Sequence, residues 1–167
     1  RFQYILPYYD FGRSIESDFK GTFNFSSSGS NTLKNTNNLK TQVTNNFSYS
    51  SDDYFSDIGF KNNFNLYFKN FNALAKNDAI YKSNLQSELM SIFEVSSSLP
   101  LIKREDDIIL NSLTPKISFR YNPTNMKNYS SESRTVNSDN IFSINRLGIN
   151  DSFEAGRSLT LGIDYKK

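Results

Sequence analysis

The stretch DFKGTFNFS, residues 18–26, alternates apolar and polar residues at every second position. Side chains on an extended strand point to opposite faces in turn. Phe19, Gly21, Phe23 and Phe25 would therefore share one face, while charged, hydroxyl and amide side chains would share the other. This period of two predicts a β-strand with one apolar face and one polar face, rather than an amphipathic helix.

The same alternation returns in four further runs of the sequence, at residues 42–49, 58–69, 113–121 and 157–165. These runs approach the ~9–11 residues of a strand that crosses a bilayer at a tilt, whereas soluble strands average about 5–6 residues. The chain is therefore expected to be all-β, with about seven or eight long, meandering antiparallel strands.

The apolar side of these runs is rich in Phe, and many of the tyrosines fall near the ends of the runs. Aromatic girdles of this kind lie at the two interfaces of a membrane barrel, whose outer face meets lipid and whose lumen is polar. The residues expected to face lipid are Phe19, Phe23, Phe25, Phe60, Phe64, Leu66, Phe68, Ile117, Phe119, Leu159, Leu161 and Ile163.

The composition agrees with a sheet that is apolar on one side only. Hydrophobic residues make up 37% of the chain and aromatic residues 15%, so the apolar area is concentrated in rings. No run approaches the ~20 apolar residues that a transmembrane helix needs. A membrane β-barrel segment is the favoured interpretation, and a soluble β-sandwich or an extracellular β-solenoid is the alternative.

Several classes of chemistry find little support in the sequence. The net charge is +2, so nucleic acid is not an expected partner, and the chain has neither Cys nor His. The acidic pairs at residues 52–53 and 106–107 are interpreted as solvated loop charge. Asp151 and Glu154 lack the cage of oxygen ligands that calcium requires. We therefore expect no catalysis, no cofactor and no metal.

Polar, turn-rich stretches separate the predicted strands. These connectors are expected to begin or lie at residues 26–38, 50–53, 75–78, 103–107 and 122–139.

Prolines and one irregular run qualify the strand pattern. Pro7 and Pro100 are expected at strand ends or kinks, and Pro123 at the start of a loop. Pro115 lies inside an alternating run, so it requires a bulge, a strand start or interrupted pairing. Residues 89–99 are apolar on both faces because of Met90 and Ile92, which suggests that this strand packs against something in the interior.

One segment is more specific than this general pattern. Residues 140–162 read NIFSINRLGINDSFEAGRSLTLG. This resembles the segment N-x-F-S-x-N-R…D…E-x-G-x-R…G, which joins two barrel strands in the lipopolysaccharide-assembly (LptD, organic-solvent-tolerance) family. Residues 113–121, LTPKISFRY, resemble the family's strand before a long loop, and residues 99–101 resemble a family strand end.

The resemblance implies a function and a set of partners. A barrel of this family takes lipopolysaccharide from periplasmic bridge proteins and inserts it into the outer leaflet of the bacterial outer membrane, with an LptE-type lipoprotein plug seated in the barrel. Residues 1–167 would then be part of one such barrel domain, truncated at both ends. A porin or receptor-type barrel for small solutes, and a soluble β-rich binding or adhesion module, are the alternatives.

The residues of this segment also have a direct interpretation. Residues 141–146 are predicted to form a short strand, residues 147–156 a loop, and residues 157–165 a lipid-facing strand. Polar side chains at the base of the loop are expected to pin it by hydrogen bonds and ion pairs rather than to contact a substrate. These are Asn145, Arg146, Asp151, Glu154 and Arg157.

Overall fold

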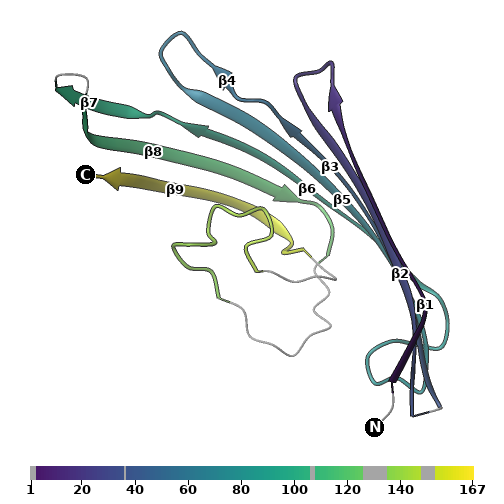
Figure 1. The fold of residues 1–167 in the computed structure, drawn as a ribbon. Helices are drawn as coiled ribbons and strands as arrows, with labels where there is room; N and C mark the ends of the chain where they lie inside the picture. Colours follow the sequence, from purple (N-terminus) through teal and green to yellow (C-terminus); the bar gives the residue numbers. More distant parts are fainter. Residues whose placement is uncertain (1–2, 36, 106–107, 126–134, 148–152) are drawn as a thin grey trace.

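The protein is a single curved antiparallel sheet (Figure 1). The computed structural model describes residues 3–35, 37–105, 108–125, 135–147 and 153–167. In this part of the chain the sheet has nine strands, and there is no helix with the length and apolarity that a membrane crossing requires. The predicted all-β, antiparallel class is confirmed.

The strand number is slightly higher than the predicted seven or eight. Seven strands have 11 to 16 residues, and the two additional strands, β4 and β7, have 2 and 5 residues. The strands are β1 (Gln3–Ser17), β2 (Gly21–Lys34), β3 (Asn38–Ser51), β4 (Tyr54–Phe55), β5 (Lys61–Lys76), β6 (Gln86–Ser98), β7 (Leu101–Glu105), β8 (Ile108–Asn122) and β9 (Gly156–Lys166).

Strands that follow one another in the chain pair with one another at all but two places. β3 and β4 both pair with β5 and not with each other. β6 and β7 lie end to end along the same edge of β8, and β9 pairs with its other edge. Pro100 lies at the break, and Pro115 lies opposite it, where its carbonyl accepts a hydrogen bond from Leu99 N at 3.1 Å. The expected strand end at Pro100 and interrupted pairing at Pro115 are confirmed, since proline has no N–H to donate.

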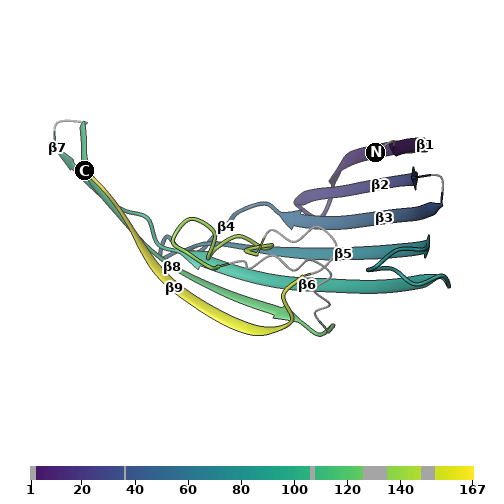
Figure 2. The ribbon, with the colours of Figure 1, turned by 90° about the horizontal axis from the view of Figure 1, so that it is seen from below.

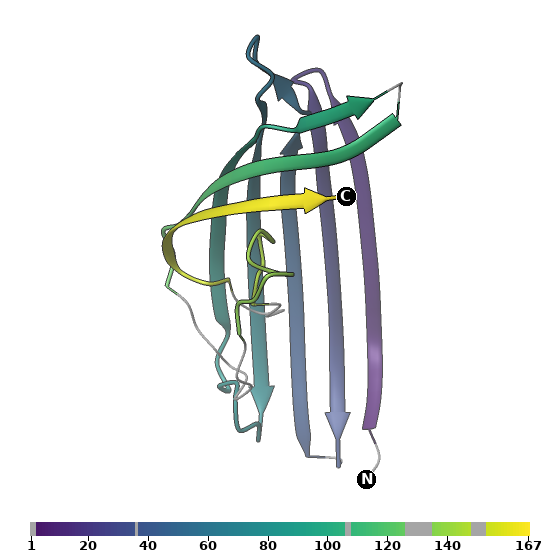
Figure 3. The ribbon, with the colours of Figure 1, turned by 90° about the vertical axis from the view of Figure 1, so that its left-hand side faces the viewer.

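The curvature gives the sheet a concave and a convex face. β8 and β9 curl in front of the other long strands, and the described residues of the connection between them lie on the concave side (Figures 2 and 3). The sheet is not closed: within the described residues, β1 and β9 each pair along one edge only.

An apolar belt covers the convex face, and the strand register brings its rings together. Phe23 and Tyr49 are 4.7 Å apart between ring centroids, and Phe47 and Phe68 are 6.3 Å apart. The belt is formed by Ile15, Phe23, Phe25, Phe47, Tyr49, Phe64, Leu66, Phe68, Phe93, Val95, Ile117, Phe119, Leu159, Leu161 and Ile163.

Two residues predicted for the apolar face are not on a strand. Phe19 lies in the turn between β1 and β2 with 78% of its surface exposed, and Phe60 precedes β5. The prediction for Phe19 and Phe60 is wrong because the alternating pattern was continued beyond the strand ends. A tight turn at Phe19 and a loop at Phe60 interrupt the period of two. The other ten predicted residues lie on the convex face, as expected from their alternation.

The serine-rich stretch at residues 26–38 is not the predicted loop. β2 continues to Lys34, and the turn residues Asn35 and Asn37 follow it. Ser and Asn favour turns when they are isolated, but here their side chains bond to one another across strands. Ser27 Oγ donates to Asn45 Oδ1 at 2.7 Å, and Asn46 Nδ2 donates to Ser26 Oγ at 3.1 Å. β3, β5 and β7 likewise extend into predicted connectors.

A glycine in β2 allows the close approach of β3. A Cβ added to Gly21 would lie 2.5 Å from the Ser50 carbonyl oxygen and 2.7 Å from Tyr49 Oη. Gly21→Ala is therefore expected to lower the free energy of unfolding by about 1–3 kcal/mol, since backbone atoms would have to move. Urea-induced unfolding of both proteins measures the difference.

Gly12→Ala is the matched control, because the nearest atom to its added Cβ is 3.8 Å away. This substitution should leave stability unchanged or raise it slightly, since alanine loses less backbone entropy than glycine. Equal destabilisation by both substitutions would show that the contact with β3 is not the cause.

Candidate functional site: the inward segment and the concave face

The described part of the connection from β8 to β9 lies against the concave face. We call this part, residues 135–147 and 153–155, the inward segment. Residues 141–146 form turns and not the predicted strand. Local hydrogen bonds explain this difference: Ile141 N donates to Asn137 O at 3.0 Å and Ser143 N to Asn140 O at 2.8 Å. These bonds close turns inside the segment and leave no strand partner.

Glu154 is the centre of the polar contacts in the segment. Arg146 donates to it through both Nε and Nη2, each at 2.6 Å, as a bidentate pair. Arg120, from the concave face of β8, places Nη1 3.5 Å from Glu154 Oε2. The hydrogen bonds from Arg146 lower the pKa of the Glu154 carboxyl below its usual value, although partial burial opposes this shift.

Two side chains of β8 also hold the backbone of the inward segment. Arg120 Nε donates to the Ile144 carbonyl at 3.0 Å and Nη2 to the Glu154 carbonyl at 3.2 Å. Asn122 Nδ2 donates to the same Glu154 carbonyl at 2.9 Å. Arg120 and Asn122 are 4% and 2% exposed, so these bonds satisfy donors that would otherwise be buried without a partner.

Apolar contacts add to the docking of the segment. Phe153 is 6% exposed and packs with Met90 and Ile92 of β6 and with other buried residues, while Ile144 packs against the edge of this cluster. Lys69 Nζ lies 4.8 Å from the centre of the Phe153 ring. The expectation that Met90 and Ile92 pack against something in the interior is confirmed, because they share a buried cluster with Phe153 of the inward segment and with Tyr81 of the connection between β5 and β6.

A third contact ties the segment to β9. The ring of Phe142 lies over Gly162, where an added Cβ would be 2.7 Å from the ring. Lys116 Nζ is 5.1 Å from the centre of the same ring and forms an ion pair with Asp164 on β9. The absence of a side chain at position 162 thus makes room for the segment.

The structure brings together some of the residues predicted to pin the loop. Arg146 and Glu154 form the bidentate pair, and Asn145 lines a cavity beside it. Arg157 does not join them: it is exposed on the convex face, with its guanidinium 5.4 Å from the centre of the Tyr121 ring. Asp151 lies outside the described residues.

Sequence reasoning missed Arg120 and Asn122, which make most of the contacts from the sheet. A signal for them was present. Both occupy the polar positions of the alternating β8 run, close to the start of the long connection, where inward-pointing side chains meet a loop that folds back.

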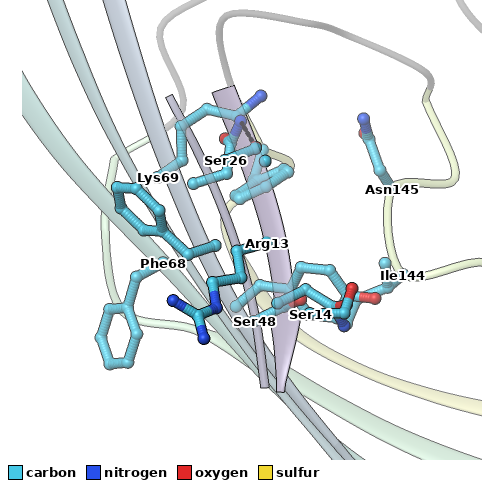
Figure 4. A pocket seen from close by; sticks show the side chains of 14 residues that line it. Arg13, Ser14, Ser26, Ser48, Phe68, Lys69, Ile144 and Asn145 are labelled. Carbon is cyan, nitrogen blue, oxygen red and sulfur yellow. Dashed lines mark hydrogen bonds between the residues drawn. The ribbon is translucent and has the colours of Figure 1, made fainter. Parts of the chain in front are cut away.

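A cavity of about 600 Å³ lies between the inward segment and the concave face of β1, β2, β3 and β5 (Figure 4). Ile144 and Asn145 approach it from the segment, and Ser14, Ser26 and Ser48 from the strands. The wall is mixed, because Tyr67, Ile144 and Phe153 line it together with these hydroxyl and amide groups, so the cavity suits water or a ligand that has both polar and apolar parts. Asn24, Asn46 and Lys69 also line it.

The described residues offer little for metal or acid–base chemistry. They contain no group of three or more acidic, His or Cys side chains that could hold a metal ion. Asp53 forms an ion pair with Lys61 at 2.7 Å, at the end of the loop that joins β3 to β5. The contacts on the concave face are those of a docked segment.

Comparison of the chain with protein families, curated proteins and solved structures finds no match.

The Glu154 contacts can be tested by removing the charge. Glu154→Gln removes the ion pairs that this carboxylate forms with Arg120 and Arg146 and leaves Arg120 with Glu94 alone, so docking of the inward segment should weaken by about 1–3 kcal/mol. A spin label on Ser143→Cys, an exposed position in a chain without cysteine, reports docking as restricted motion in electron paramagnetic resonance spectra. The label should become more mobile in the Glu154→Gln protein.

Asp164→Asn provides the control for this substitution. Asp164 pairs with Lys116, but its side chain is 54% exposed, and exposed ion pairs contribute only about 0–1 kcal/mol. The label should therefore keep its restricted motion. A mobile label in this variant, or a restricted one in Glu154→Gln, would contradict the role assigned to Glu154.

Acid should release the segment by the same route. The pKa of Glu154 is lower in the folded protein than its ordinary 4.5, so its ion pairs stabilise docking fully above about pH 5. This contribution is lost as the pH falls through the folded-state pKa. The spin label should gain mobility in that acidic range, and the Glu154→Gln protein should lack this transition. An identical acid transition in both proteins would assign it to another group.

Proposed function

We propose that the chain forms part of the wall of an outer-membrane β-barrel. The observation that carries this proposal is the division of the sheet into an apolar convex face and a largely polar concave face. Leu159, Leu161 and Ile163 are 63–71% exposed on the convex side. Burial of this face in lipid removes the cost of exposing it, and the concave face then lines a wet lumen.

The course of the belt across the sheet supports this arrangement. Residues that pair directly across neighbouring strands form a row perpendicular to the strands. The row that starts at Phe23 on β2 ends at Arg157 on β9. On β9, however, the belt is centred on Leu161, four residues further along. A shift of four residues over five strand-to-strand steps corresponds to a tilt of about 30°. Barrel strands tilt by roughly 35–45°, so a belt parallel to the membrane would cross them in this way.

The open edges of β1 and β9 also bear on the proposal. Unpaired N–H and C=O groups are too costly in hydrocarbon, so strands span a bilayer only in closed sheets. Further strands must therefore pair with β1 and β9 in the membrane. A soluble sandwich instead requires a second sheet over the convex face. Its apolar positions would then form a core, and the polar ones on the concave face would meet solvent.

The particular barrel we propose belongs to the lipopolysaccharide-assembly family. Its support is the resemblance of residues 140–162, because Arg146, Glu154 and Gly162 of that motif are residues that dock the inward segment. Lipopolysaccharide would pass along the polar lumen while its acyl chains reach lipid. The expected partners are an LptE-type lipoprotein plug and the periplasmic bridge proteins.

Depletion of the complete protein from the bacterium that makes it tests this function. Lipopolysaccharide should accumulate at the inner membrane and decrease in the outer membrane, as measured after separation of the two membranes on a density gradient. Re-expression of the unmodified gene should restore the distribution, which serves as the control.

Two other outcomes would favour the alternatives. An unchanged lipopolysaccharide distribution with slower uptake of small solutes would indicate a porin or receptor; the inward segment would then act as a loop that narrows a channel. Recovery of the protein in the soluble fraction would indicate a binding or adhesion module. Either outcome would overturn the proposed function.

A further inference from the structure

A band of uncharged polar residues follows the apolar belt on the convex face. We call it the polar collar: Ser27 and Asn31 on β2, Thr41 and Asn45 on β3, and Asn70 and Asn72 on β5.

Side-chain hydrogen bonds run across the collar from strand to strand. Ser27 Oγ donates to Asn45 Oδ1 at 2.7 Å, Asn45 Nδ2 to Asn70 Oδ1 at 3.2 Å, and Asn72 Nδ2 to the same oxygen at 2.6 Å. On the β1 side, Tyr9 Oη lies 3.2 Å from Ser27 Oγ. The collar is therefore a continuous polar surface and not a set of isolated side chains.

Charge is absent from this part of the convex face. On β2, β3 and β5, no charged residue points outward between the belt and Lys76; the other positions there are Gly29, Val43 and three leucines near the strand ends. The concave face of the same strands carries Lys34, Lys40 and Lys69. A surface bathed in water normally carries charged residues, so the collar suits an uncharged, hydrogen-bonding environment.

The length of the collar indicates what surrounds it. From Phe68, the last belt residue of β5, to Lys76 there are eight residues, which rise about 20–25 Å along the membrane normal at the tilt given above. A phospholipid headgroup layer is only about 5–8 Å thick on each side of the bilayer. The headgroups of a glycolipid that carries a sugar chain extend further and could reach along the collar.

We propose that the polar collar contacts the sugar chains of the glycolipid in the outer leaflet. The end of β2 at Lys34, the start of β3 at Asn38 and the connection from β5 to β6 lie at the same end of the sheet in Figure 3, and this end then faces the cell exterior. The hydroxyl and amide groups of the collar both donate and accept, as sugar hydroxyls do. This inference rests on the membrane location in the proposed function, and not on the transport step.

Adjacent serines on opposite faces allow a matched test. Residues 1–167 contain no cysteine, so Ser27→Cys on the collar and Ser28→Cys on the concave face each add one thiol to this part of the complete protein, and the unmodified protein gives the background labelling. Leu161→Cys marks the belt. Intact cells are labelled with a membrane-impermeant maleimide, in a strain with full-length lipopolysaccharide sugars and in one whose sugars are truncated.

Ser27→Cys should label several-fold more slowly in the strain with full-length sugars, while labelling of Ser28→Cys should be the same in both. Equal labelling of Ser27→Cys in the two strains would overturn the sugar contact. Labelling of Ser27→Cys only after cells are broken would overturn the orientation. Protection of Ser27→Cys in the truncated strain and in broken cells would place the collar inside the bilayer and overturn the proposal.

Labelling of Leu161→Cys tests the membrane location by itself, so failure of the sugar contact can be distinguished from failure of the proposed function. It should resist labelling in both strains and in membranes from broken cells, because hydrocarbon excludes the reagent. If Leu161→Cys instead labels freely in broken cells and the protein is soluble, the membrane location itself fails. Loss of lipopolysaccharide transport has no bearing on these readings.

Discussion

The antiparallel register is the constraint on which every other contact in this sheet depends. Side chains alternate between faces, so a shift of one residue in any strand would exchange its convex and concave sets. In β8 the register turns Phe119 toward the belt and Arg120 toward the inward segment. The same register places Glu94 opposite Arg120 on the concave face and Val95 opposite Phe119 on the convex face. A single pattern thus sets both the apolar convex face and the site for docking.

The inward segment depends on this sheet because it has little structure of its own. Its turns are local, and its burial comes from Met90 and Ile92 on one side and from the Arg120 donors on the other. A buried guanidinium is costly unless its charge and donors are satisfied. Glu154 and two carbonyl oxygens meet that need here, and Arg146 completes the ion pairing. The sheet and the segment therefore satisfy each other's buried groups, which explains how a polar loop can lie against a wall.

Much of the sheet could be predicted from alternation, and the exceptions have physical causes. The run 157–165 and the double-faced apolar pattern at Met90 and Ile92 appear in the structure as expected, because burial follows directly from side-chain direction. The serine-rich end of β2 was missed because Ser and Asn have low strand propensity when considered alone, and cross-strand partners are invisible in one sequence. The position of Arg157 was missed for a different reason: it was assigned to the base of the loop, although alternation along 157–165 places it on the same face as Leu159.

The residues that carry the family resemblance also bear on where selectivity would lie. Arg146, Glu154 and Gly162 contact other parts of the same chain, so the motif acts in docking the segment against the wall. In the proposed barrel, recognition of cargo would then fall to the cavity, which is lined by Ser14 from β1 and by Asn145 from the inward segment. Barrels could share the docking residues and still differ in cargo, since the two sets of side chains occupy separate positions on the concave side.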